Sequence, residues 1–105
     1  MTRELHLGLI GLGEVGQVLA SDLHLKQGVK LCAWDRLFAL ENSEPQRAAA
    51  ALPFLAAATA MAQAVRDRAI VISAVTAGEC RAAALEAAQA LTPGTYYLDL
   101  SLIHI

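Results

Sequence analysis

The sequence predicts an α/β fold in which helices cover both faces of a parallel, doubly wound sheet. Three observations predict it. Short apolar runs of strand type alternate with helical patterns along the chain. The first run leads directly into the glycine pattern Gly11-x-Gly13-x-x-Gly16 and then into a helix. A later run, AIVISAV at 69–75, is rich in β-branched residues, which is typical of a central parallel strand. Right-handed crossovers favour the strand order 3-2-1-4-5.

The first unit of this fold is a strand over 6–10, a helix over 14–26 and a second strand over 29–34. Apolar residues recur through the predicted helix at helical spacing (Val15, Val18, Leu19 and Leu23). Gly28 ends the helix, and the second strand follows at once.

The three glycines between the first strand and helix predict a dinucleotide site. Gly11 allows the tight turn, Gly13 lets the backbone approach a pyrophosphate, and Gly16 lets the helix pack closely on the strand. Free N–H groups and the helix dipole then favour the phosphates without a basic side chain. No Lys or Arg lies between Glu4 and Lys26. The alternative is an ordinary structural turn.

The second strand ends at Asp35, which lies 24 residues after Gly11. A carboxylate near this position accepts hydrogen bonds from the adenosine ribose and repels a 2′-phosphate, so Asp35 favours NAD over NADP. Arg36 weakens this preference, because its guanidinium could pair with a 2′-phosphate or stack on adenine. A solvated loop charge is the other interpretation of Arg36.

The remaining elements continue the alternation. Residues 37–51 turn polar and then alanine-rich, with a short helix beginning at Pro45. A third strand over 54–57 precedes a small helix over 60–66, with Thr59 as its N-cap. The strand over 69–75 is followed by a helix over 79–91, which Pro93 and Gly94 end, and by a fifth strand over 95–100.

The loop after the fourth strand is the second candidate part of the site. Open α/β sheets bind ligands outside the carboxyl ends of their strands. We therefore expect Val75, Thr76 and Ala77 near the second ribose or the nicotinamide. The alternative is a plain loop in which Thr76 caps the next helix.

Composition bounds the partners. The chain has 105 residues, enough for one domain, and a net charge of −2 with scattered basic residues, so neither nucleic acid nor an anionic membrane is an expected partner. No run is long enough to span a bilayer, and a cytoplasmic location is expected. Cys32 and Cys80 lie far apart, so the sequence predicts neither a disulfide framework nor a metal site.

The segments GLIGLGEVGQVLASDL, AWDR, VISAVTAGE and TPGTYYLDLS together resemble the N-terminal domain of the β-hydroxyacid dehydrogenase family, which includes 3-hydroxyisobutyrate and 6-phosphogluconate dehydrogenases. The resemblance implies a Rossmann domain of an NAD(P)-dependent oxidoreductase that acts on 3-hydroxyacids. It also implies that the nucleotide is bound by the residues that match the family motif (Gly11, Leu12, Gly13, Glu14, Val15, Gly16, Asp35 and Arg36). Residues matching Val75, Thr76 and Ala77 line the nicotinamide side.

The resemblance stops near Asp99. The family continues with a segment of the type Asn-Ser-x-Ser-Pro, whereas this chain ends in Ser-Leu-Ile-His-Ile. Read with the standard code, the codons CTG TCT CTT ATA CAC ATC give the amino acids of residues 100–105, and this string resembles a transposase end sequence used in preparing sequencing libraries. We therefore expect an NAD(P)-binding domain over 1–100, incomplete at its C-terminus, and a non-native tail over 101–105. A natural terminus is the alternative.

The family's catalytic lysine lies in a helical second domain that binds the hydroxyacid substrate, and no residue here matches it. We expect this chain to contain no catalytic residue, to bind the nucleotide without catalysis, and to come from a homo-oligomeric full-length protein. Two other hypotheses about the function stay open. The chain could be the N-terminal domain of an imine or pyrroline carboxylate reductase, or a non-catalytic nucleotide-binding module. An adenosylmethionine site is disfavoured, because that ligand lacks a pyrophosphate.

Overall fold

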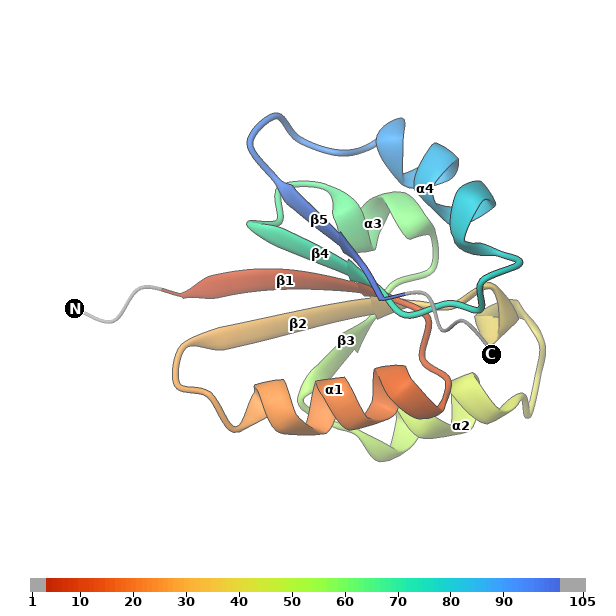
Figure 1. Ribbon diagram of the computed structural model, residues 1–105. Helices are drawn as coiled ribbons and strands as arrows, with labels where there is room; N and C mark the ends of the chain where they lie inside the picture. The colour runs from red at the N-terminus through yellow and green to blue at the C-terminus, as the bar shows by residue number, and fades with distance from the viewer. Residues whose placement is uncertain (1–3, 101–105) are drawn as a thin grey trace.

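A computed structural model of the chain describes residues 4–100 and has one five-stranded sheet in the order β3-β2-β1-β4-β5 (Figure 1). Every neighbouring pair of strands is parallel. The predicted order and the α/β class are therefore confirmed. The strands are β1 (Leu5–Ile10), β2 (Val29–Trp34), β3 (Leu55–Ala57), β4 (Ile70–Ser73) and β5 (Tyr96–Asp99). The tail that we expected over 101–105 lies outside the described residues.

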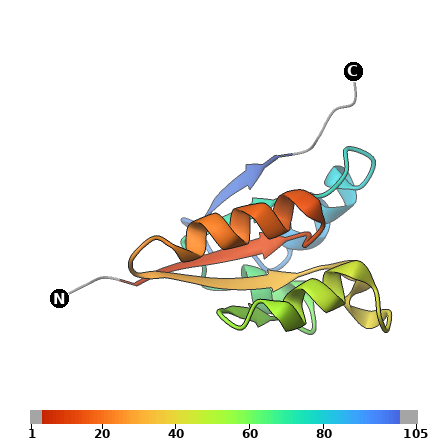
Figure 2. The same ribbon diagram turned by 90° about the horizontal axis from the view of Figure 1, so that it is seen from below.

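Helices cover the two faces of the sheet, as a doubly wound fold requires (Figures 1 and 2). On one face lie α1 (Glu14–His24) and α2 (Glu44–Ala51), and on the other lie α3 (Met61–Val65) and α4 (Cys80–Ala88). None of the helices within residues 4–100 is long and apolar enough to cross a bilayer.

The alternation of side chains along β1 divides the core between these faces. Leu7 and Leu9 are buried in a cluster that includes Ala20 of α1, whereas Ile10 is buried with Val71 and Ala83 on the side of α3 and α4. Residues 7–10 of β1 are buried on both faces, and they contain no polar side chain. This central strand carries the glycine turn at its carboxyl end.

The elements differ from the predicted ranges mainly at their ends. The helix predicted over 14–26 ends at His24, because the N–H groups of Leu25 and Lys26 donate to the carbonyls of Asp22 and Leu23 in a tighter turn. The helix predicted over 79–91 is shorter for the same kind of reason, since the N–H of Ala90 donates to the carbonyl of Ala87. The fourth strand covers 70–73 rather than 69–75.

One local prediction was wrong, and one element was not predicted. Thr59 is not an N-cap: the helix begins one residue later, at Met61, and its N-cap is Ala60. The Gln63 side chain instead reaches back, and its Oε1 accepts from the N–H and the hydroxyl of Thr59 at 2.9 and 3.0 Å. The 3-10 helix η1 (Arg36–Ala39), which the Asp35 side chain caps, was not predicted from the sequence.

Candidate functional site

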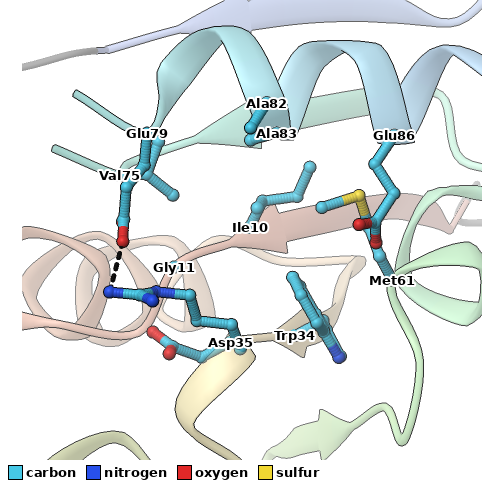
Figure 3. Close-up of a pocket in the computed structure, with 11 residues that line it drawn as sticks. Ile10, Gly11, Trp34, Asp35, Met61, Val75, Glu79, Ala82, Ala83 and Glu86 are labelled. Carbon is cyan, nitrogen blue, oxygen red and sulfur yellow. Dashed lines mark ion pairs between the residues drawn. The ribbon is translucent and has the colours of Figure 1, made fainter. Parts of the chain in front are cut away.

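The carboxyl ends of β1, β2 and β4 meet opposite the first turns of α4 and bound a cleft of about 250 Å³ (Figure 3). The strand ends are level, because Ile10 pairs in register with Trp34 on one side and with Ser73 on the other. The interior of the cleft is largely apolar, and its charged groups lie on β2–η1 and α4. The lining residues are Ile10, Gly11, Trp34, Asp35, Arg36, Met61, Val75, Glu79, Ala82, Ala83 and Glu86.

Gly11 makes the turn out of β1. Its φ is +96°, and a Cβ atom there would lie 2.8 Å from the carbonyl oxygen of Ala74. Its N–H donates to the carbonyl of Trp34 at 2.8 Å, which holds the turn against the end of β2. Both the backbone conformation and the close approach of Ala74, the residue after β4, therefore require glycine at this position.

Gly13 and Gly16 differ in what surrounds them. A Cβ at Gly16 would lie 2.1 Å from the carbonyl oxygen of Gly11, so Gly16 lets α1 pack against the turn. A Cβ at Gly13 meets nothing within 4 Å among the described residues, and its φ of −78° is open to any residue. The fold needs no glycine at Gly13, and a ligand that approaches the backbone there does need one.

Gly13 is also the N-cap of α1, and within residues 4–100 no side chain caps this helix end. The first-turn amides of an α-helix have no partner inside the helix. They carry the positive end of the helix dipole, which favours an anion. The open backbone and the uncapped helix start fit a pyrophosphate.

Asp35 lies at the end of β2 and is held by two backbone amides. Its Oδ2 accepts from the N–H of Leu12 at 2.7 Å, and its Oδ1 accepts from the N–H of Leu37 at 2.9 Å. A carboxylate has about four lone-pair sites, so each oxygen can accept one more hydrogen bond. The half-buried carboxylate faces the cleft and can accept from the hydroxyls of a ribose.

The residues predicted for cofactor binding fall into three groups in the structure. Gly11, Asp35, Arg36 and Val75 line the cleft. The glycine loop and first turn of α1 lie beside it, with Leu12 and Gly16 buried, Gly13 and Val15 half-buried and Glu14 exposed. Thr76 and Ala77 are exposed in the loop between β4 and α4. The 0% exposure of the Leu12 side chain assigns that side chain to the core.

Thr76 does not cap the helix that follows it. Among the described residues no side chain caps the start of α4, whose N-cap is Glu79. Thr76 contributes instead its carbonyl, which accepts from the N–H of Glu79 at 2.9 Å. The threonine hydroxyl is therefore not committed to the helix end.

The sequence did not predict that residues of α4 and its N-cap line one side of the cleft, which we call the α4 wall. Glu79, Ala82, Ala83 and Glu86 recur at helical spacing and line the cleft together. The two alanines leave room for a flat group, and the glutamates stand at either end. Their spacing was a usable signal, since the start of this helix was expected near the ends of the strands.

Trp34 and Met61 complete the apolar interior of the cleft (Figure 3). Trp34 is the last residue of β2 and the only tryptophan in the chain. It directly precedes Asp35, so a planar group bound in the cleft would contact its ring. Because the chain has no other tryptophan, a fluorescence change on binding is assigned to Trp34.

One ion pair crosses the cleft. The Nη2 of Arg36 lies 2.5 Å from Oε1 of Glu79, and this pair is the dashed line in Figure 3. Of the lining residues that carry charge, Arg36 is the single cation and three are carboxylates, Asp35, Glu79 and Glu86. The charged rim is therefore net negative.

A second hollow, of about 530 Å³, lies on the other side of Trp34, Asp35 and Arg36 and is bounded by α2 and the end of β3. Its lining includes no residue of the glycine turn or of the loop after β4. The smaller cleft is the better candidate site, because it joins the glycine turn to the ends of β2 and β4.

Comparison with known proteins identifies a family for the chain. The profile described as the NAD binding domain of 6-phosphogluconate dehydrogenase matches residues 6–105. No curated protein matches the chain at a significant level.

Solved structures share the fold. A 3-hydroxyisobutyrate dehydrogenase from Mycobacterium tuberculosis, with L-serine, has a TM-score of 0.77 and 21% identity over 93% of this chain. A conserved hypothetical protein from Sinorhizobium meliloti 1021 has a TM-score of 0.83 and 24% identity over 95% of it. A diketoreductase, described as performing dual catalysis on dicarbonyl compounds, has a TM-score of 0.68 and 20% identity over the whole chain. This chain spans 32%, 33% and 44% of those three chains.

Proposed function

The chain belongs to the family of the NAD binding domain of 6-phosphogluconate dehydrogenase, and from this premise we propose that it is the cofactor-binding part of an oxidoreductase. The proposed reaction transfers a hydride between a 3-hydroxyacid-type substrate and a nicotinamide dinucleotide. We further propose a cytoplasmic location, and, from the resemblance to the β-hydroxyacid dehydrogenases, that the full-length protein assembles as a homo-oligomer.

The observation that carries the proposal is the space at Gly13. Its Cβ position is open, and the uncapped start of α1 lies behind it. This combination is the one that a pyrophosphate needs, because the backbone can approach the phosphates and the helix dipole favours their charge. The packing of the domain does not require this open space at Gly13, because no described residue lies within 4 Å of the Cβ position.

Each part of the site then has a task toward a bound dinucleotide. The adenosine lies in the cleft between Trp34 and the alanines of α4, and Asp35 accepts from the ribose hydroxyls. The amides at the start of α1 hold the pyrophosphate. Val75, Thr76 and Ala77 lie on the side that the nicotinamide takes. When bound, the nicotinamide supplies the hydride acceptor or donor.

The reaction also needs a group that takes the hydroxyl proton of the substrate. We place that group, and the residues that select the substrate, in the helical second domain that the family resemblance implies. Residues 4–100 then bind and orient the nucleotide. The net negative rim, together with Asp35, favours NAD over NADP.

Titration with NADH, NADPH and adenosylmethionine tests the proposal, with Trp34 fluorescence as the readout and circular dichroism to establish folding. We expect NADH to bind more tightly than NADPH, and adenosylmethionine to give no response. A folded protein that responds to neither nicotinamide nucleotide contradicts the proposed function. A response to adenosylmethionine alone would assign the cleft to another class of ligand.

A further inference from the structure

We propose that Glu79 is a specificity-determining residue that withholds Arg36 from a ribose 2′-phosphate. This inference rests on the proposed function and adds to it a second residue, outside the dinucleotide fingerprint, that sets the preference for NAD. The observation behind it is the ion pair that joins the end of β2 to the start of α4 across the cleft (Figure 3).

Arg36 is the group that a 2′-phosphate would need. It is the single cation among the lining residues of the cleft, and it follows directly on Asp35, the residue placed to bind the ribose. A guanidinium presents a fork of donors that matches a phosphate. With its Nη2 on Glu79, part of that fork is already engaged.

The Glu79 side chain is more restrained than the Arg36 side chain. Glu79 is the N-cap of α4, its N–H donates to the carbonyl of Thr76, and its side chain is 34% exposed. The positive end of the helix dipole also favours its charge. Arg36 is 67% exposed on a long side chain. Binding of a 2′-phosphate would therefore require Arg36 to leave, and would place the phosphate near a carboxylate that stays.

Asp35 does not provide this discrimination alone. Both of its oxygens accept hydrogen bonds from backbone amides, so its charge is already partly balanced by Leu12 and Leu37. Glu79 opposes a second phosphate in two ways, by competing for Arg36 and by repelling the added charge. Removing the Glu79 charge should therefore favour ligands that carry a 2′-phosphate.

The test compares adenosine 5′-monophosphate with adenosine 2′,5′-bisphosphate, which differ only in the 2′-phosphate, by Trp34 fluorescence at low salt. Glu79→Gln is expected to improve the affinity of the bisphosphate relative to the monophosphate about fivefold, since exposed ion pairs compete by up to about that factor. In an Arg36→Gln background no competition for Arg36 remains, so Glu79→Gln should raise the ratio by less than it does in the wild-type background, through the loss of repulsion alone.

Glu86→Gln is the charge-matched comparison. It removes one carboxylate from the α4 wall, and Glu86 pairs with no cation among residues 4–100. We expect a smaller change in the ratio than for Glu79→Gln. Equal changes would mean that only the total charge matters, and would overturn the role of the Arg36 pair.

The outcomes separate the two proposals. If the wild-type protein binds NADH and the monophosphate but Glu79→Gln leaves the ratio unchanged, this inference fails and the proposed function stands. If the folded wild-type protein binds neither, both fail.

Discussion

The carboxylate of Asp35 ties the end of β2 to the glycine turn through Leu12, whose backbone N–H donates to Oδ2 at 2.7 Å. Its other oxygen accepts from the N–H of Leu37 and caps η1. One side chain thus fixes the turn after β1 and the helix after β2. Asp35 therefore stabilises the fold whether or not a ribose is bound.

Replacement of Asp35 should therefore reduce stability as well as change the cofactor preference. Asp35→Ala leaves the amides of Leu12 and Leu37 without their acceptor, and a buried unpaired amide costs about 1–3 kcal/mol. We expect the free energy of unfolding in urea to fall by about 2–4 kcal/mol. Asp22→Ala, at an exposed aspartate of α1, is the matched control and should stay within about 0.5 kcal/mol of wild type.

The preference for the nucleotide is measured on the milder variant Asp35→Ser. Loss of the charge should narrow the ratio of NADH affinity to NADPH affinity, because a 2′-phosphate is no longer repelled at this position. An unchanged ratio, in a protein whose folding is intact, would refute the ribose role of Asp35.

The two glycines at the start of α1 should respond in opposite ways to substitution. Gly16→Ala puts a Cβ against the carbonyl of Gly11 at 2.1 Å, and should cost about 3 kcal/mol of unfolding free energy. Gly13→Val has open space and an extended backbone, so its stability should stay within about 1 kcal/mol of wild type. It should nevertheless abolish nucleotide binding, since the side chain fills the space for the pyrophosphate.

Gly78→Ala is the matched control for Gly13→Val. Its Cβ position is also open among the described residues, and it lies in the loop before α4. With adenosine diphosphate as the ligand, this variant should bind like wild type. If Gly13→Val also bound adenosine diphosphate normally, the phosphates would not lie at the start of α1.

The sequence predicted the class and the glycine turn because both depend on local patterns, and it predicted the strand order because parallel crossovers are right-handed. Strand and helix periodicities are short-range, and the glycine spacing brings its own strand and helix with it. The ends of elements were less predictable. Thr59 looked like an N-cap, but the Gln63 side chain competes for its amide and hydroxyl. A local sequence pattern does not reveal whether the Thr59 hydroxyl binds a backbone amide of the helix or the side chain of Gln63.

The α4 wall and the Arg36–Glu79 pair were not predicted, because both depend on tertiary geometry. Arg36 and Glu79 lie 43 residues apart in the sequence and meet only when the ends of β2 and β4 are level. The sequence did place Asp35 directly after the second strand. It could not show that the Asp35 carboxylate would be bound by the amides of Leu12 and Leu37.

The Arg36–Glu79 pair should contribute little to stability. Both side chains are partly exposed, and exposed ion pairs are worth about 0.2–1 kcal/mol. We expect Glu79→Gln to lower the free energy of unfolding by less than about 1 kcal/mol at low salt. A loss several times larger would mean that the ion pair stabilises the fold. The effect of Glu79→Gln on nucleotide affinity would then have to be measured in a stabilised variant of the protein.

Two buried groups should make the protein less stable in alkali. Burial raises the pKa of the Cys32 thiol, with an opposing contribution from the charge of Arg68. Burial also raises the pKa of the Tyr97 hydroxyl. In each case the folded protein holds the proton more tightly than the unfolded chain does. The stabilisation is therefore complete below the unfolded pKa and is lost as the pH rises through the folded pKa.

The free energy of unfolding should accordingly fall as the pH rises above the ordinary cysteine value of 9.0, and Cys32 should account for part of the slope. One such group contributes at most about 1.4 kcal/mol per pH unit between its two pKa values. Cys32→Ala should give a shallower slope above about pH 9 in urea unfolding. Ala33→Gly, on the same strand, lowers stability without removing a titrating group and should keep the wild-type slope. If both variants gave the wild-type slope, the alkaline loss would not come from Cys32.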